Sequence, residues 1–257
     1  MSLFDLAGKS AVITGSSRGI GKAIAERMAE HGAKVVISSR KAEACDAVAA
    51  EINQRFGQGS AIACAASISS KADLQRLVDT ANQAFGKIDI LVANAASNPH
   101  FGSILTIPDD AFRKILENNV VANNWLAQMV VPQMIERKNG VFIIVSSIGG
   151  LRGSPVIGGY NVSKAADFQL ARNLAVELGP HNIRVNCIAP GLVRTDFAKA
   201  LWEDPERLER TTSTTPLRRI GEPDDIAGAA VFLASAAGAF MTGSAIVIDG
   251  GATIGWS

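Results

Sequence analysis

The sequence lacks the features of extracellular, metal-binding and nucleic-acid-binding proteins. Its three cysteines, Cys45, Cys64 and Cys187, have no metal or redox spacing, so we expect buried free thiols in a reducing compartment. Its three histidines are scattered, and we expect no metal site. The 25 Lys and Arg residues are balanced by 24 Asp and Glu residues without a basic stripe, which argues against a nucleic-acid partner.

Signals for export and for membrane insertion are also missing. Residues 1–8 have no basic segment followed by an apolar one, so we expect no signal peptide. The longest run of low polarity, residues 226–241, is shorter than the roughly 20 residues that a membrane span needs, and its Ala and Gly content is typical of a core helix. We therefore expect a soluble cytoplasmic protein with no membrane partner.

Alternating strand and helix patterns run along the whole chain, and no linker, repeat or low-complexity tract interrupts them. Hydrophobic residues make up 47% of the sequence, enough for one substantial core. The alternation predicts an α/β fold, a single Rossmann-like domain over residues 1–257 with a doubly wound parallel sheet of about seven strands, helices on both faces and a site at the carboxyl edge. The expected strands are 9–13, 34–38, 60–65, 88–92, 141–146, 183–188 and 244–248.

A glycine-rich turn follows the first predicted strand. Gly15, Gly19 and Gly21 have the spacing Gly-x-x-x-Gly-x-Gly, and an Ala-rich helical pattern comes next. Glycines allow close backbone approach, and a helix N-terminus offers free N–H groups, so this arrangement predicts binding of a nucleotide pyrophosphate. The other turn residues in the predicted cofactor site are Ser17, Arg18 and Ile20.

The end of the second predicted strand favours NADP(H) over NAD(H). An NAD site usually has an acidic residue here, about 20 residues after the turn, to accept from the ribose 2′-OH. This chain has Ser39 and Arg40 instead, and Arg18 lies inside the glycine turn. Two guanidiniums and a hydroxyl suit a 2′-phosphate, although two solvated surface arginines are the alternative interpretation.

Tyr160 and Lys164 are the main candidates for chemistry. They are four residues apart in a predicted helix, 158–179, and therefore lie on the same face. A neighbouring ammonium lowers the pKa of a phenol from about 10 towards the working pH, which makes the tyrosine usable as a general acid or base. Ser147 follows the predicted strand 141–146 and is expected at the same edge of the sheet.

Three further segments are expected near this edge. Asn94 and Ala95 follow the strand 88–92, where small residues allow close approach to a ligand. Asn118 and Asn119 lie within a helical region over 108–138, either as surface residues or for a polar task. Residues 195–218 are charged and threonine-rich but contain Trp202, and we expect a substrate lid there.

These motifs together resemble the short-chain dehydrogenase/reductase family, and the resemblance covers essentially the whole chain. The resemblance implies that Tyr160 donates a proton to the substrate carbonyl, that Ser147 hydrogen-bonds the same oxygen, and that Lys164 holds the nicotinamide ribose. Asn119 matches the asparagine of a proton relay, and Asn118 is the less favoured register. The further cofactor contacts that it implies are Ser67 and Ile68 at the adenine and Pro190, Gly191, Val193 and Thr195 at the nicotinamide.

Within the family, the chain looks most like NADPH-dependent carbonyl/retinal reductases of the peroxisomal type, which end in a peroxisomal tripeptide. This chain ends in Gly255-Trp256-Ser257, without that address. The resemblance also implies a homotetramer, with the helical regions 108–138 and 158–179 and the C-terminal strand at its interfaces. The residues expected to contact substrate are Asn98, Phe101, Ile157 and Trp202.

The function expected from these features is NADP(H)-dependent reduction of a ketone or aldehyde, reversible as oxidation of a secondary alcohol. One alternative is a 3-oxoacyl-[acyl-carrier-protein] reductase, which needs a basic patch beside the entrance to dock its acidic carrier; only Lys138 and His181 are expected near that place. A non-catalytic NADP-binding sensor is the alternative from another class. A sensor has no need of Tyr160 or Lys164, and both residues are present.

Overall fold

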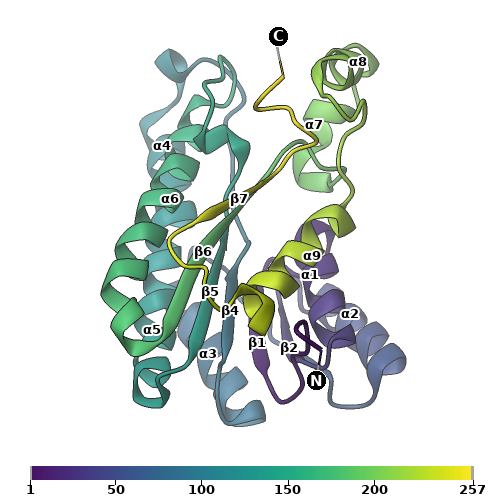
Figure 1. Ribbon diagram of the computed structural model, residues 1–257. Helices are drawn as coiled ribbons and strands as arrows, with labels where there is room; N and C mark the ends of the chain where they lie inside the picture. The colour runs from purple at the N-terminus through teal and green to yellow at the C-terminus, as the bar shows by residue number, and fades with distance from the viewer. Residues whose placement is uncertain (1, 256–257) are drawn as a thin grey trace.

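Within residues 2–255, which the computed structural model describes, seven parallel strands form one sheet in the order β3-β2-β1-β4-β5-β6-β7 (Figure 1). This confirms the doubly wound parallel sheet expected from the alternating pattern. The strands are β1 (Ser10–Thr14), β2 (Lys34–Ser38), β3 (Ala61–Ala63), β4 (Ile90–Ala93), β5 (Gly140–Val145), β6 (Ile183–Pro190) and β7 (Ala245–Ile248).

Helices cover both faces of the sheet, in two layers that Figure 1 shows to its left and right. One layer packs α1, α2 and α9 on the sheet, and the other packs α3, α5 and α6. The helices are α1 (Gly19–Glu30), α2 (Ala42–Phe56), α3 (Lys71–Phe85), α4 (Asp109–Leu116), α5 (Ala122–Arg137), α6 (Gly158–Leu178), α7 (Lys199–Trp202), α8 (Pro205–Thr214) and α9 (Pro223–Ala234).

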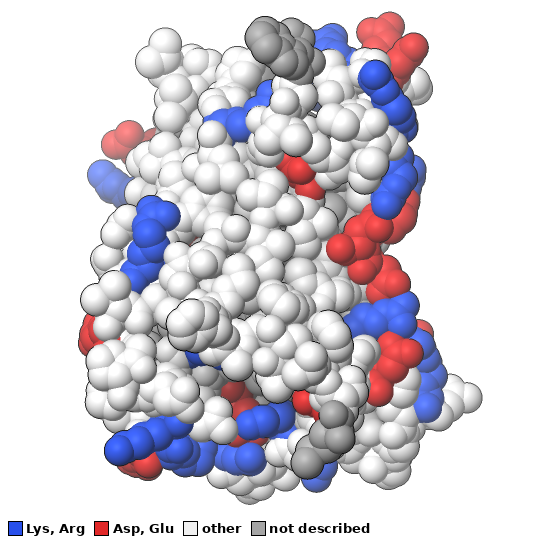
Figure 2. Space-filling view, in the orientation of Figure 1, with Lys and Arg blue, Asp and Glu red and all other residues white. Residues whose placement is uncertain are grey.

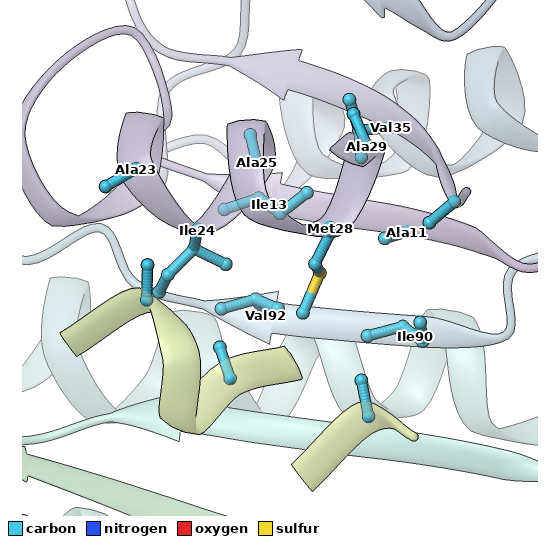
Figure 3. Close-up of a cluster of buried hydrophobic side chains, with 14 of the residues drawn as sticks. Ala11, Ile13, Ala23, Ile24, Ala25, Met28, Ala29, Val35, Ile90 and Val92 are labelled. Atoms are coloured by element: carbon cyan, nitrogen blue, oxygen red, sulfur yellow. The ribbon is translucent and has the colours of Figure 1, made fainter. Parts of the chain in front are cut away.

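Each central strand contributes to both cores, because successive side chains of a strand point to opposite faces. In β1, Ile13 belongs to the core under α1 and α9, whereas Val12 belongs to the core under α3 and α5. Figure 3 shows Ile24 and Met28 pointing from α1 toward the strands of the first core. Both side chains are fully buried, so α1 and the turn before it are held firmly on the sheet.

The crevice of the fold lies where β1 and β4 are neighbours. From β1 the chain turns into α1 on one face, and the connections beyond β4 lead to α5 on the other face. The loops that follow the two strands therefore separate at the carboxyl edge, which is where ligands bind in open α/β sheets. No helix among the described residues combines the length and apolar character needed to cross a membrane.

Three local features differ from the sequence-based expectation. Strand β6 continues through Pro190, which pairs with Ile248, because a proline at the end of a strand loses only its own N–H bond. The expected helix over 108–138 contains a π-helical turn, Glu117–Val121. The lid region 195–218 is mostly helical, as α7 and α8. Trp256 and Ser257 of the expected C-terminal segment lie outside the described residues.

Candidate active site

The glycine turn is shaped by close contacts that a side chain would prevent. Gly15 has φ +67°, and a Cβ atom at Gly21 would lie 2.4 Å from the Gly15 carbonyl oxygen. The Asn94 amide donates to the carbonyl oxygens of Thr14 and Gly15, at 2.9 and 3.1 Å. Asn94, at the end of β4, therefore fixes the shape of the turn that follows β1, and α1 starts in a defined direction.

The N-terminus of α1 is open to a ligand. Its N-cap residue, Arg18, makes no side-chain cap hydrogen bond, and the first turn holds no acidic residue. The free N–H groups and the positive end of the helix dipole therefore face the crevice without an internal anion, which suits a pyrophosphate. The residues present at this turn fit a dinucleotide.

A first cavity of about 850 Å³ lies on the β2–β3 side of this turn. Its cationic lining residues are Arg18, Arg40 and Lys41, and none of its described lining residues is acidic. It gathers the residues that the sequence predicted for the phosphate, adenine and ribose 2′ positions: Gly15, Ser17, Arg18, Ser39, Arg40, Ser67, Ile68, Asn94 and Ala95.

A second cavity of about 520 Å³ lies on the β5–β6 side, and Arg18 and Asn94 line both cavities. Ser147 comes from the end of β5, Tyr160 and Lys164 come from α6, and all three line it. The other predicted site residues that line it are Gly19, Ile20, Gly21, Asn98, Phe101, Ile157, Pro190, Gly191, Val193 and Thr195.

Lys164 is buried with its charge compensated. Its ammonium donates to the carbonyl oxygen of Val145 and to Asp167 Oδ2, both at 3.0 Å, and lies 5.6 Å from the centre of the Tyr160 ring. Burial alone would lower the pKa of Lys164, but Asp167 and Tyr160 outweigh it and raise that pKa. Lys164 is therefore a fixed positive charge beneath the tyrosine.

Tyr160 is more firmly protonated than the sequence predicts. Burial raises the pKa of Tyr160 above its ordinary value, and the opposing effects of Lys164 and of the Ser147 hydroxyl are smaller. Lys164 therefore lowers the pKa of Tyr160, as expected, but the effect of burial on that pKa is larger. At neutral pH the phenol carries its proton and can donate it.

The two neighbouring asparagines have different surroundings. Asn118 lines the first cavity, whereas Asn119 is fully buried and lines neither cavity. The Asn119 side chain donates to the Ser97 carbonyl and to Ser163 Oγ, at 3.0 and 2.9 Å, and accepts from Ser97 N at 2.8 Å. The π-helical turn carries both asparagines, and Asn119 is linked to the first cavity only through Ser97, which lines it. The geometry places the Asn119 side chain as an internal anchor.

Trp202 does not line either cavity, unlike the prediction for it. Its indole N–H donates to the Thr195 carbonyl at 2.9 Å, and Arg194 packs 5.2 Å from its ring. The indole is thus used inside the lid, and Phe197 and Leu201 reach the second cavity instead. The sequence does not show whether a tryptophan in a charged segment faces the cavity or packs within the lid.

The lid touches the rest of the site at three places. Asp196 pairs with Arg18 at 2.9 Å. The Phe197 ring lies 5.9 Å from the Tyr160 ring, and Arg207 of α8 lies 5.3 Å from the ring of Phe101. The first residues of the lid, within 195–201, thus line the second cavity and contact the glycine turn, and Arg207 of α8 contacts Phe101 in the cavity wall.

Asp167 was not predicted as a site residue, although it lies three residues after Lys164 and therefore on the same helix face. Its carboxylate is fully buried and accepts from Asn123 of α5 at 3.1 Å as well as from Lys164. An isolated Asp in a helix is usually solvated, so the sequence contains little to mark it as buried.

Comparisons with known proteins agree with this geometry. A family model described as enoyl-(acyl carrier protein) reductase matches residues 15–253. Dehydrogenase/reductase SDR family member 4 of Homo sapiens is 46% identical over 247 residues, which cover 96% of this chain and 88% of that protein. The protein of the same name from Bos taurus is 45% identical over 244 residues, covering 95% and 86%.

Solved structures extend the likeness to three dimensions. A 7α-hydroxysteroid dehydrogenase, complexed with NADH and 7-oxo glycochenodeoxycholic acid, has a TM-score of 0.92 at 40% identity and covers 97% of this chain and 96% of its own. A gluconate 5-dehydrogenase from Burkholderia cenocepacia J2315, in complex with NADP and tartrate, has a TM-score of 0.92 at 31% identity, covering 98% and 97%.

Proposed function

Since the chain belongs to the short-chain dehydrogenase/reductase family, whose members are oxidoreductases acting on C=O and CH–OH groups, we propose that it is an NADP(H)-dependent reductase of ketones or aldehydes. The reverse reaction is oxidation of a secondary alcohol. The observation that carries the proposal is the convergence of Ser147, Tyr160 and Lys164 in one cavity beside the glycine turn. A protein that only binds the cofactor has no need of a tyrosine beside a buried, charge-compensated lysine.

The two cavities fit the two ends of one dinucleotide. The lining residues of the first cavity would hold the adenosine end, the glycine turn would hold the pyrophosphate, and the second cavity, with Thr195 in its wall, would hold the nicotinamide end. The bound cofactor supplies the hydride. Lys164 would hold the nicotinamide ribose, while Pro190, Gly191 and Val193 line the wall on the β6 side.

Selectivity for NADP(H) rests on the charge of the first cavity. Three cationic residues and no described acidic residue line it, so a 2′-phosphate gains favourable interactions and meets no carboxylate. The Arg18–Asp196 ion pair is largely exposed, with side-chain exposures of 67% and 62%, and such pairs contribute only about 0–1 kcal/mol. A phosphate can therefore compete with Asp196 for Arg18.

Proton transfer is assigned to Tyr160. The Ser147 hydroxyl and the Tyr160 phenol hydrogen-bond the substrate carbonyl oxygen, and the phenol delivers its proton as that oxygen becomes an alkoxide. Because burial raises the pKa of Tyr160, the acid form is available at neutral pH and carbonyl reduction is favoured there. Alcohol oxidation needs the phenolate, and its rate should rise with pH.

The second cavity favours an apolar substrate with a few polar groups. Apolar side chains from four segments, Phe101, Ile148, Ile157 and Leu201, face it. Asn98 Oδ1 and Asn161 Oδ1 are buried without a hydrogen-bond partner among the described residues, and both asparagines line this cavity. Because these oxygen atoms are buried, a donor group of the substrate could reach them only after the side chains turn toward the cavity.

The carrier-protein alternative loses its support from sequence. Lys138 and His181, which were expected beside the entrance, lie just before β5 and β6 begin. They are therefore at the amino edge of the sheet, opposite the cavities. The loops that carry them are joined by a hydrogen bond from the Asn182 side chain to the Lys138 carbonyl oxygen, at 2.9 Å. The expected placement was wrong because both residues precede the predicted strands 141–146 and 183–188, and loops before parallel strands lie at the amino edge of the sheet.

We further propose the assembly and location expected from the sequence, a cytoplasmic homotetramer. Figure 2 shows a face over β7 that carries few charged side chains at its centre. Phe240, Val247 and Ile254 expose apolar surface around this edge strand, which favours pairing of copies. Cys45, Cys64 and Cys187 are free and buried, as suits a reducing compartment.

The first test is a substrate panel with both reduced cofactors. The purified protein is mixed with aromatic ketones, α-diketones, retinal or a short 3-oxoacyl thioester, and oxidation of NADPH and NADH is followed. We expect turnover of an apolar carbonyl with NADPH preferred. Turnover with NADH alone would contradict the cofactor assignment, and NADPH binding without turnover in either direction would favour the sensor.

A further inference from the structure

We propose that Asp167 is a positioning residue of the reaction, which keeps the Lys164 ammonium charged and directed into the second cavity; this rests on the proposed function. Asp167 itself touches neither cavity. It acts through Lys164, which it contacts at 3.0 Å.

The pair is buried too deeply to be ordinary surface charge. The side-chain exposures of Lys164 and Asp167 are 3% and 0%. Replacing a buried ion pair by apolar residues of similar size is often neutral or stabilising, so folding alone does not explain two charges here. A requirement for a charged lysine beside Tyr160 does explain them.

The hydrogen bonds of Lys164 leave one direction free. An ammonium has three N–H donors, and Asp167 Oδ2 and the Val145 carbonyl each receive one. The remaining donor serves the cavity that Lys164 lines. Asp167 thus fixes both the charge and the orientation of the group.

Asp167 is itself held from the neighbouring helix. Asn123 of α5 donates to Asp167 Oδ1 at 3.1 Å and to the carbonyl oxygen of Asn119 at 2.6 Å. Asn119 belongs to the π-helical turn, so a chain of hydrogen bonds joins this turn to Lys164. The carboxylate cannot turn away from the lysine without breaking that chain.

Few ionisable groups surround the pair. Tyr160 on α6 and Cys187 on β6 are the titratable groups that act on it, while Ser146 from β5 and Asn123 from α5 are neutral hydrogen-bonding partners. Burial raises the pKa of the Cys187 thiol to about 12, so that thiol stays neutral. The negative charge of Asp167 therefore acts on Lys164 and Tyr160 without another nearby anion.

The chain offers a direct readout, because Tyr160 is its only tyrosine. Phenolate absorbance during an alkaline titration therefore reports Tyr160 alone, without substrate or cofactor, and Tyr160→Phe provides the blank. The variants are Asp167→Asn, which removes the charge at nearly constant size, and Asn123→Ala, which disturbs the same network but keeps the charge.

We expect the Tyr160–Lys164 pair of Asp167→Asn to lose its first proton on the order of one pH unit lower, because the nearby anion that favours both protons is gone, and the phenolate midpoint to differ from that of wild type. The alkaline limb of kcat/KM for carbonyl reduction should move in the same direction, since the Tyr160–Lys164 pair loses its first proton at lower pH. Asn123→Ala should keep the wild-type midpoint. Equal midpoints for Asp167→Asn and wild type would overturn the proposal.

Removing one partner of a buried ion pair is strongly destabilising, so Asn123→Ala carries the test if Asp167→Asn does not fold. Loss of the Asn123 hydrogen bond raises the pKa of Asp167, and the acid limb of reduction should move to higher pH. An unmoved limb would contradict the proposal. The titration needs no turnover, so inactivity of the wild type on every carbonyl would reject the proposed function without touching this result.

Discussion

The two cavities differ in the kind of charge that they present. The first is lined by Arg18, Arg40 and Lys41, which are solvated and can exchange partners. The second contains Lys164, whose charge is buried and fixed by Asp167. The difference shows that binding an anion needs accessible cations, whereas adjusting an acid needs one immobile charge at a set distance.

The largest expected effect separates the roles of the two cavities. Tyr160→Phe should lower kcat for carbonyl reduction by about 10²–10⁴-fold, because the proton donor is lost. NADPH affinity should fall far less than kcat, since the adenosine and pyrophosphate ends of the proposed cofactor site lie in the first cavity and at the glycine turn, and Tyr160 does not line the first cavity. Stopped-flow reduction and fluorescence titration measure the two quantities. A variant that kept wild-type kcat would remove Tyr160 from the chemistry.

Reversing the charge of the first cavity should change cofactor choice without impairing chemistry. Ser39→Asp places a carboxylate beside the proposed 2′-phosphate, and the ratio of kcat/KM for NADPH to that for NADH should fall about 10²-fold through like-charge repulsion. Ser39→Asn is the uncharged control. If the ratio of the Asp variant equalled that of wild type, the phosphate would lie elsewhere.

The glycine turn between the two cavities should not tolerate even one added methyl group. Gly21→Ala brings Cβ to 2.4 Å from the Gly15 carbonyl, and we expect a loss of about 1–3 kcal/mol in the free energy of unfolding. Gly228→Ala in α9 meets nothing within 4 Å and should raise it by about 0.5–1 kcal/mol. Urea unfolding of both variants checks this, and equal effects would contradict the packing account.

The smallest effect concerns the ion pair between the lid and the turn. Asp196→Asn frees Arg18, and NADPH affinity should rise by up to about fivefold, the size of an exposed pair. The gain should shrink at high salt, where surface charges are screened. Weaker NADPH binding by the variant would mean that Asp196 supports the cofactor instead of competing with it.

The residues that could be predicted from sequence are those whose chemistry is encoded locally. The glycine turn and the Tyr160–Lys164 spacing can be predicted from sequence because a few neighbouring residues determine a turn or a helix face. The alternation of seven predicted strands with helices was likewise enough to predict one doubly wound parallel sheet, which the structure has.

Residues whose role depends on distant partners could not be predicted. The burial of Asp167 depends on Asn123 of another helix, and the pKa of Tyr160 depends on the enclosure that several loops create. Trp202 was placed wrongly because its partner, the Thr195 carbonyl, lies seven residues away in a bent segment.

One local signal was available and was not used. Asp204 precedes Pro205, and its side chain accepts from Glu206 N at 3.0 Å and from Arg207 N at 3.3 Å. An N-cap aspartate followed by proline in the first turn predicts a helix start, which is where α8 begins.

The central claim is that one cofactor spans both cavities and delivers hydride to a carbonyl beside Tyr160. The most direct measurement is reduction of the best carbonyl substrate with NADPH carrying deuterium at both C4 positions of the nicotinamide, followed by mass spectrometry and NMR of the alcohol. The account predicts deuterium on the former carbonyl carbon and almost no labelled alcohol from Tyr160→Phe. NADPH consumption that leaves this carbon unlabelled would contradict it.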